Sequence, residues 1–183
     1  MGGARSRRVF FALWPDHESV GHLDALGRNL AGSGSRLMRP ETLHLTLAFV
    51  GSVTPAQVAE LEEIAAGVRA GAFDLSIDRL GFWPQRGILW AGCAQTPEPL
   101  RRLAGTLVAA LGAAGFAVDH RAGSALTPHV TLARRVRCSS LPRLGTPVQW
   151  RVSEYSLVES HLGSPAARYE TLANFALSEA NPG

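Results

Sequence analysis

A short motif occurs twice in this chain of 183 residues, and it constrains the fold more than any other feature. His44-Leu45-Thr46-Leu47 and His129-Val130-Thr131-Leu132 share the order histidine, apolar, threonine, apolar. Each copy lies in a stretch of apolar and β-branched residues that predicts a strand, and a proline shortly before it favours an extended chain. Because side chains alternate along a strand, the histidine and threonine of each copy share one face.

The repetition favours a functional site over two unrelated core histidines. Given the composition, a histidine starts this pattern with a chance of roughly one in a hundred, so six histidines should give well under one match. Either copy alone is equally well explained as a partly buried histidine with satisfied ring nitrogens. For both copies to be structural, two unrelated histidines would each have to be partly buried in the same pattern, so a functional site is the better explanation.

The composition excludes several classes of protein. No apolar run reaches the eighteen residues of a membrane span, and residues 9–14 are too short for a secretion signal and are followed by Pro15 and Asp16. Cys93 and Cys138 are far apart, and neither has a second cysteine or a histidine at metal-binding spacing, so we expect free thiols. We expect a cytoplasmic, monomeric protein with one domain over residues 1–183 and no membrane contact.

The basic residues are all arginines, and the net charge is +3. The planar guanidinium suits phosphate recognition, which points to a phosphorylated or nucleic-acid partner. A compositional bias of the genome explains the absence of lysine better.

Periodicity predicts three helices among many strands. The helices are expected at residues 16–30, 54–70 and 97–114, with Asp16 and Thr54 as N-terminal caps and Gly115 ending the third. Alternation predicts that the segments 73–82 and 88–93 pair as a hairpin, and that residues 121–127 and 139–147 are loops. The other strands are expected at residues 8–14, 36–49, 116–120, 129–134, 148–159 and 169–178. This irregular order predicts an α+β fold of two lobes whose sheets face each other.

Two lobes that bring the motifs together would place two imidazoles and two hydroxyls in one cleft. One neutral and one protonated histidine can act as general base and general acid on a phosphodiester, and hydroxyls can hold its oxygens. A metal site is the main competitor. It is disfavoured because each strand supplies one ligand, with no Asp, Glu or Cys at the alternate positions. No serine or cysteine nucleophile signature is present.

The residues resemble the 2H phosphoesterase superfamily, and more specifically its RNA 2′,3′-cyclic phosphodiesterase branch, also called 2′-5′ RNA ligase or LigT-like. The resemblance rests on both motifs and covers nearly the whole chain. The segments that carry it are 8–15, 39–47, 80–90, 128–134 and 168–170. It implies a two-lobed α+β fold with internal pseudo-twofold symmetry, two antiparallel sheets facing a central cleft, and helices outside.

The resemblance also implies a reaction and roles for individual residues. Members hydrolyse a ribose 2′,3′-cyclic phosphate to the 2′-phosphate without metal or cofactor, and some join RNA ends in reverse. Carried onto this sequence, His44 is the proton donor and His129 the proton acceptor. Thr46, Thr131 and Arg134 are expected to bind the phosphate. Phe11, Trp83 and Tyr169 are candidates for stacking on a base, with core packing the competing explanation for Phe11.

One stretch departs from the family pattern. Between Arg121 and Thr127 the chain has a run of mostly small residues, 122–126, where an arginine and an aromatic residue closer to the second histidine are expected. This leaves base preference and substrate length open. Two other functions remain open as well: an RNA-end binding module without turnover, and a phosphodiesterase for another cyclic phosphate such as ADP-ribose 1″,2″-cyclic phosphate.

Overall fold

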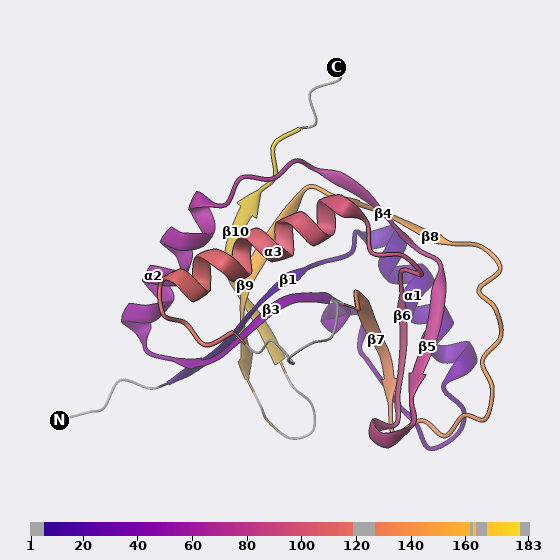
Figure 1. Cartoon of the computed structure of the whole chain (residues 1–183). Helices are drawn as coiled ribbons and strands as arrows, with labels where there is room; N and C mark the ends of the chain where they lie inside the picture. Colours follow the sequence, from indigo (N-terminus) through magenta and orange to yellow (C-terminus); the bar gives the residue numbers. More distant parts are fainter. Residues whose placement is uncertain (1–5, 119–126, 162, 164–167, 180–183) are drawn as a thin grey trace.

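The computed structural model describes residues 6–118, 127–161, 163 and 168–179, and Figure 1 shows their arrangement. The three helices are α1 (His17–Leu30), α2 (Pro55–Gly67) and α3 (Glu98–Ala113). The strands are β1 (Arg7–Leu13), β2 (Arg36–Leu37), β3 (Leu45–Val53), β4 (Phe73–Ile77), β5 (Arg79–Trp83), β6 (Ile88–Gly92), β7 (His129–Arg134), β8 (Val148–Val152), β9 (Glu154–His161) and β10 (Arg168–Ala176). Two short 3₁₀ turns cover Pro40–Thr42 and Pro84–Arg86.

Apart from β4 and β8, the strands form two antiparallel groups that join where β3 pairs with β7. The order β10-β9-β1-β3 makes one group, and β7-β6-β5, with β2 beside β7, makes the other. In the described part of the chain, β3 and β7 pair through Leu45 and Val130 alone. Figure 1 shows the two groups diverging from this junction. The predicted α+β fold with two antiparallel sheets is confirmed.

The helices cover the faces of the sheets that carry the core. Helix α3 packs on β3 and α2, α2 contacts β10, and α1 packs on β7 and β8. The short sheet β4-β8 contributes Leu75, Ile77 and Trp150, each at most 2% exposed, to the same core. Among the described residues, no helix is long and apolar enough to cross a membrane.

Local sequence signals explain where the helices begin and end. Asp16 accepts a hydrogen bond from the Ser19 backbone N–H at the start of α1. Thr54 and Gln57 form a reciprocal capping box at the start of α2. Helix α3 buries the leucines that recur at helical spacing, Leu100, Leu103, Leu107 and Leu111, and the chain turns at Gly115 with a φ of +84°. All three helix predictions are confirmed to within a few residues.

Several strand predictions are corrected. The strand expected over 36–49 is interrupted by the turn Pro40–Thr42, so β3 begins at Leu45 and runs on to Val53. The strand expected over 73–82 divides at Asp78, since β4 pairs with β8 while β5 forms the predicted hairpin with β6. Likewise, 148–159 divides at Ser153 into β8 and β9, which lie in different sheets. Alternation continues through such breaks, and therefore cannot locate them.

One strand prediction fails. Residues 116–118 are irregular where a strand was expected, although Phe116 and Val118 pack against the core. Residues 119–120 of that strand, and most of the loop 121–127 where the sequence departs from the family pattern, lie outside the described residues.

Trp90 lies over the backbone of its own hairpin, and this requires a glycine on the opposite strand. Gly81 of β5 pairs with Trp90 of β6, and a Cβ atom at Gly81 would overlap the indole ring. Trp90 is 4% exposed, so the ring has little room to move away. A larger residue at position 81 must therefore displace a buried aromatic side chain.

We expect Gly81→Ala to lower the free energy of unfolding by about 1–3 kcal/mol, the usual cost of overpacking. Urea denaturation measures the change. Gly105→Ala is the matched control, because position 105 lies within α3 and a Cβ there meets nothing within 4 Å. It should stabilise the protein by up to about 1 kcal/mol. Equal stability of Gly81→Ala and wild type would contradict this account of the hairpin.

Candidate active site

Both motifs line one cavity of about 290 Å³ at the junction of the two strand groups. Leu45 and Val130, fully buried, point into the core, while the histidine and threonine of each motif line the cavity. The antiparallel pair Leu45–Val130 fixes this arrangement, because its register places His44 opposite Thr131 and Thr46 opposite His129. The remaining lining residues are Arg8, Phe10, Met38, Thr42, Phe49, Arg134, Ser160 and Tyr169.

The two histidines are held in the same way. Nδ1 of His44 lies 2.7 Å from the carbonyl oxygen of Thr42, and Nδ1 of His129 lies 2.8 Å from that of Thr127. A carbonyl accepts only, so in each ring Nδ1 carries the hydrogen and donates it. Each Nε2 is then left free to accept or carry a proton on the opposite side of the ring.

Aromatic rings surround each histidine. The His44 ring contacts Phe10, Trp14 and Tyr169, with centroid distances of 5.0, 5.5 and 5.0 Å. The His129 ring meets Trp83 edge to face at 4.6 Å and Trp90 at 6.1 Å. These contacts restrict the rotation of both imidazoles, so each ring holds one orientation in the cavity.

Burial lowers the pKa of both histidines. The pKa of His44 is lowered from its ordinary value of 6.5 to about 4, first by burial and then by repulsion from His129 and Arg134, against the hydrogen bond to Thr42. The pKa of His129 is lowered for the same main reason, with Arg134 adding repulsion. Both rings are therefore neutral at pH 7 in the empty cavity.

The three residues predicted to bind the phosphate also line this cavity. Thr46, Thr131 and Arg134 line it, and no hydrogen bond from either threonine hydroxyl to another described residue is present. Arg134 is the last residue of β7 and is exposed. The cavity thus offers hydroxyl and guanidinium donors, and its described lining contains no Asp or Glu.

Of the three residues predicted to stack on a base, two lie near the site and one lies in the core. Tyr169 lines the cavity, and Trp83 lies against His129, so both are near the site. Phe11 is fully buried, and its ring packs in the core 6.2 Å from that of Tyr155 and 6.4 Å from that of Phe175. The stacking role for Phe11 is therefore wrong, because alternation along β1 turns its side chain away from the cavity.

Sequence reasoning missed Arg8, Phe10 and Trp90. Phe10 lines the cavity and contacts His44, as the neighbour of Phe11 on the opposite face of β1. Arg8 shares that face. Residues 9–14 form one continuous apolar run, so no local signal distinguishes the two faces. The core cluster, which contains Val9, Phe11 and Leu13, decides between them.

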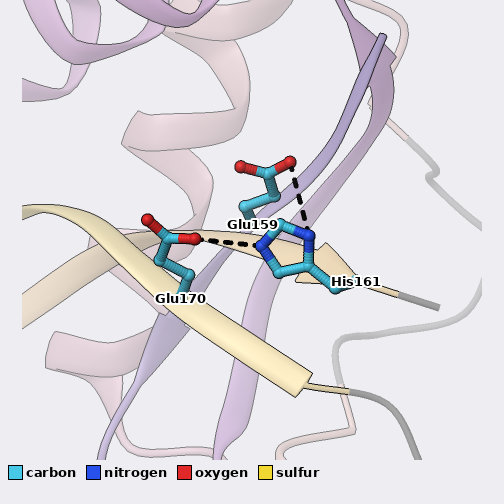
Figure 2. A group of neighbouring side chains, drawn as sticks. All are labelled: Glu159, His161 and Glu170. Carbon is cyan, nitrogen blue, oxygen red and sulfur yellow. Dashed lines mark hydrogen bonds and ion pairs between the residues drawn. The ribbon is translucent and has the colours of Figure 1, made fainter. Parts of the chain in front are cut away.

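A group of possible metal ligands lies outside the cavity. Figure 2 shows His161 between Glu159 and Glu170, with Nε2 3.0 Å from a Glu170 oxygen and Nδ1 3.8 Å from a Glu159 oxygen. Glu159 is also bound by Arg7 at 2.6 Å. By alternation along β9, these residues face away from Ser160, which lines the cavity. Arg7 pairs with Glu159 and the His161 ring lies between the two carboxylates, which is the pattern of an ion-pair network.

Comparisons with known proteins identify the family. A model of the family described as "LigT like Phosphoesterase" matches residues 13–90. The chain is 30% identical over 177 residues to an RNA 2′,3′-cyclic phosphodiesterase of Escherichia coli K12, covering 94% of this chain and 98% of that protein. The chain belongs to the LigT-like phosphoesterase family. The resemblance drawn from the two motifs is thereby confirmed, as is the prediction that the chain is an enzyme.

Other LigT-like proteins agree with this assignment. An RNA 2′,3′-cyclic phosphodiesterase of Aeropyrum pernix is 31% identical over 130 residues, covering 68% of this chain and 72% of that protein. A crystal structure of Escherichia coli LigT complexed with 3′-AMP superposes with a TM-score of 0.85 at 27% identity, covering 96% of this chain and all of that one. That LigT has also been crystallised with phosphate, with a TM-score of 0.84.

The lowered pKa of His44 predicts that the protein loses stability in mild acid. A histidine whose pKa is lower in the folded than in the unfolded state stabilises the fold fully above pH 6.5, and this contribution is lost as the pH falls towards 4. We expect the His44 contribution to fall by roughly 2 kcal/mol between pH 7.5 and pH 5. Urea denaturation at the two pH values measures it.

The variant His44→Asn should show a smaller loss over this range, because the titrating group is gone. His22→Asn is the matched control, since it removes an exposed histidine of α1, and it should keep the wild-type pH dependence. An unchanged pH dependence in His44→Asn would refute the assignment.

Proposed function

We propose that this LigT-like phosphoesterase hydrolyses RNA or nucleoside 2′,3′-cyclic phosphate to the 2′-phosphate, by general acid and base catalysis with two histidines. The observation that carries the proposal is the convergence of both His-x-Thr motifs on one cavity. The relatives named RNA 2′,3′-cyclic phosphodiesterase supply the reaction class.

The geometry supports a displacement at phosphorus between the two histidines. His129 accepts a proton from water as the water oxygen attacks phosphorus. The bond between phosphorus and the 3′ oxygen breaks, and His44 gives its Nε2 proton to that oxygen. The product carries a 2′-phosphate and a free 3′-hydroxyl. With an RNA 5′-hydroxyl in place of water as the nucleophile, the same step would form a 2′-5′ bond and leave a free 3′-hydroxyl.

The threonines and Arg134 hold the phosphate in this scheme. Thr46 and Thr131 donate hydroxyl hydrogens to the non-bridging oxygens, and Arg134 adds a full positive charge. Preorganised donors of this kind stabilise the charge that develops on phosphorus in the transition state. Tyr169, which lines the cavity, and Trp83, which lies against His129, supply aromatic surface for the nucleoside.

His44 must be protonated to act as the donor, although its pKa in the empty cavity is about 4. A bound phosphate anion resolves this conflict, because a negative charge beside a buried imidazole favours the charged form. The anion raises the pKa of His44 in this way. After each turnover His129 releases its proton to solvent and His44 takes one up, which restores both starting protonation states.

This scheme requires no metal ion. The described lining of the cavity supplies two imidazoles, three threonine hydroxyls, one serine and two guanidinium groups, and no carboxylate or thiolate to complete a ligand set. Arg134, at the reacting phosphate, supplies positive charge that a metal would otherwise provide.

Replacing either histidine should abolish most turnover. We expect His44→Ala and His129→Ala each to lower kcat by a factor of roughly a hundred to ten thousand. The assay is hydrolysis of a nucleoside 2′,3′-cyclic phosphate in EDTA, with the product identified by phosphorus NMR. His22→Ala, on the exposed face of α1, serves as the control with full activity.

Each other outcome has a definite meaning. A 3′-phosphate product would reverse the regiochemistry, and activity that returns only with added metal would refute the acid–base scheme. Tight binding of RNA with a cyclic phosphate end but no turnover would favour a binding module. Faster turnover of ADP-ribose 1″,2″-cyclic phosphate would name that compound as the substrate.

The pH profile should differ between the two kinetic constants. The profile of kcat/KM reports the free enzyme, and that of kcat reports the complex. The rate falls above the pKa of the group that must be protonated. We therefore expect the alkaline limb, assigned to His44, to lie at higher pH in kcat than in kcat/KM, because bound phosphate raises that pKa. Coincident limbs in the two profiles would contradict this role of the phosphate.

A further inference from the structure

The cavity continues past the reacting groups to a second arginine that the reaction does not use. Arg8 of β1 lines the same cavity as His44 and Thr46. Arg8, Phe10 and Ala12 share one face of β1, and Ala12 pairs with Thr46. Four residues of strand separate the backbone positions of Arg8 and Ala12, which is about 13 Å. Arg8 therefore lies at one end of the cavity, beyond the groups that hold the reacting phosphate.

Arg8 and its neighbour Arg7 differ in their partners: Arg7 pairs with a carboxylate, and Arg8 lies on an aromatic ring. Arg7, on the opposite face of β1, is bound to Glu159 at 2.6 Å, and Glu159 belongs to the ion-pair network of Figure 2. No carboxylate of the described residues pairs with Arg8. Its guanidinium instead lies 4.6 Å from the centroid of the Phe49 ring, which also lines the cavity.

This placement leaves the guanidinium available for an anion. Stacking on an aromatic ring uses the flat face of the group and leaves its N–H donors at the edge, where they can bind a phosphate bidentately. Ser160, on the strand next to β1, lines the same end of the cavity and adds a hydroxyl. The chain therefore places an unneutralised cation and a hydroxyl at a fixed distance from the reacting centre.

We infer that Arg8 binds the 5′-phosphate of the nucleotide that carries the 2′,3′-cyclic phosphate. A cavity of about 290 Å³ accommodates about one nucleotide, and the 5′-phosphate is the next phosphate along an RNA chain. The enzyme would then prefer an RNA end, or a nucleotide with a 5′-phosphate, to a nucleoside 2′,3′-cyclic phosphate with a free 5′-hydroxyl. This inference rests on the proposed function and adds a specificity-determining residue to it.

The test compares two substrates that differ in one phosphate. Adenosine 2′,3′-cyclic phosphate has a free 5′-hydroxyl, and its 5′-phosphorylated form supplies the group that Arg8 would bind. For the wild type we expect kcat/KM to be roughly ten- to a hundredfold higher with the 5′-phosphate, the usual effect of a charge-assisted hydrogen bond. The difference should lie in KM, because the contact is made equally in the ground state and the transition state.

The variant Arg8→Gln should lose most of this preference, and Arg8→Lys should keep part of it as a point charge. Arg69→Gln is the matched control, because it removes one positive charge from an exposed position after α2 and outside the cavity lining. It should keep the wild-type preference. For a short RNA with a cyclic phosphate end, Arg8→Gln should also flatten the slope of log kcat/KM against log salt by about 0.7, the value for one phosphate contact on a single strand.

Three results would overturn the inference. The first is equal kcat/KM of the wild type on both substrates. The second is an equal loss on both substrates in Arg8→Gln, which would place Arg8 at the reacting phosphate. The third is the same loss of preference in Arg69→Gln, which would indicate a general charge effect. Comparing two substrates on one enzyme sample cancels any inactive fraction.

Failure of the proposed function gives a different result. If the wild type hydrolyses neither substrate, calorimetry still measures binding of the two nucleotides. Arg8→Gln should then weaken only the binding of the 5′-phosphorylated one. Equal weakening of both, or of neither, would refute the role of Arg8 independently of any activity.

Discussion

The pairing of Leu45 with Val130 is the constraint on which the site depends. It is the point where β3 meets β7, and so where the two strand groups join. In an antiparallel pair, the residues that flank such a pair face each other across the strands. One register therefore sets the histidine of each motif opposite the threonine of the other. A slip of one residue would turn one motif towards the core.

The junction is short because the strands diverge on both sides of it. β3 continues along β1, and β7 along β6, so each motif is supported by its own strand group. Twisted strands that separate in this way leave a cavity between them instead of a continuous face. The same separation supplies the cavity walls, since each sheet contributes aromatic side chains to one histidine. The divergence of β3 and β7 thus explains both the core on the Leu45 and Val130 face of the strands and the cavity on the face of the histidines and threonines.

The chemical character of the cavity follows from how the histidines are held. Each ring donates Nδ1–H to a carbonyl two residues earlier and is packed by aromatic rings, so its free nitrogen has one orientation. The burial that fixes the rings also lowers their pKa values, and Arg134 lowers them further. A cavity with these properties, whose described lining has arginines and no carboxylate, is matched to an anion that pairs with both imidazoles.

Sequence reasoning predicted most of the elements, and the four motif residues that it expected in one cleft, His44, Thr46, His129 and Thr131, line one cavity. The helices were predictable because caps and apolar stripes are local signals, as at Asp16 and Thr54. The breaks at Asp78 and Ser153 were not, because a strand can pass to another sheet without any change in its alternation. Phe11 was misplaced and Phe10 missed because two adjacent phenylalanines have equal local claims to either face, and only the core decides between them.

The sequence by itself determined which groups are available: two histidines and two threonines at a spacing that places each pair on one face of a strand. This follows from the two-residue period of a strand, which needs no tertiary information. Tertiary structure decided everything that depends on neighbours distant in the sequence. It brought the motifs into one register, lowered the pKa values of both histidines by burial, neutralised Arg7 with Glu159, and left Arg8 facing the cavity. Burial and pairing are properties of the assembled sheets, so no local pattern encodes them.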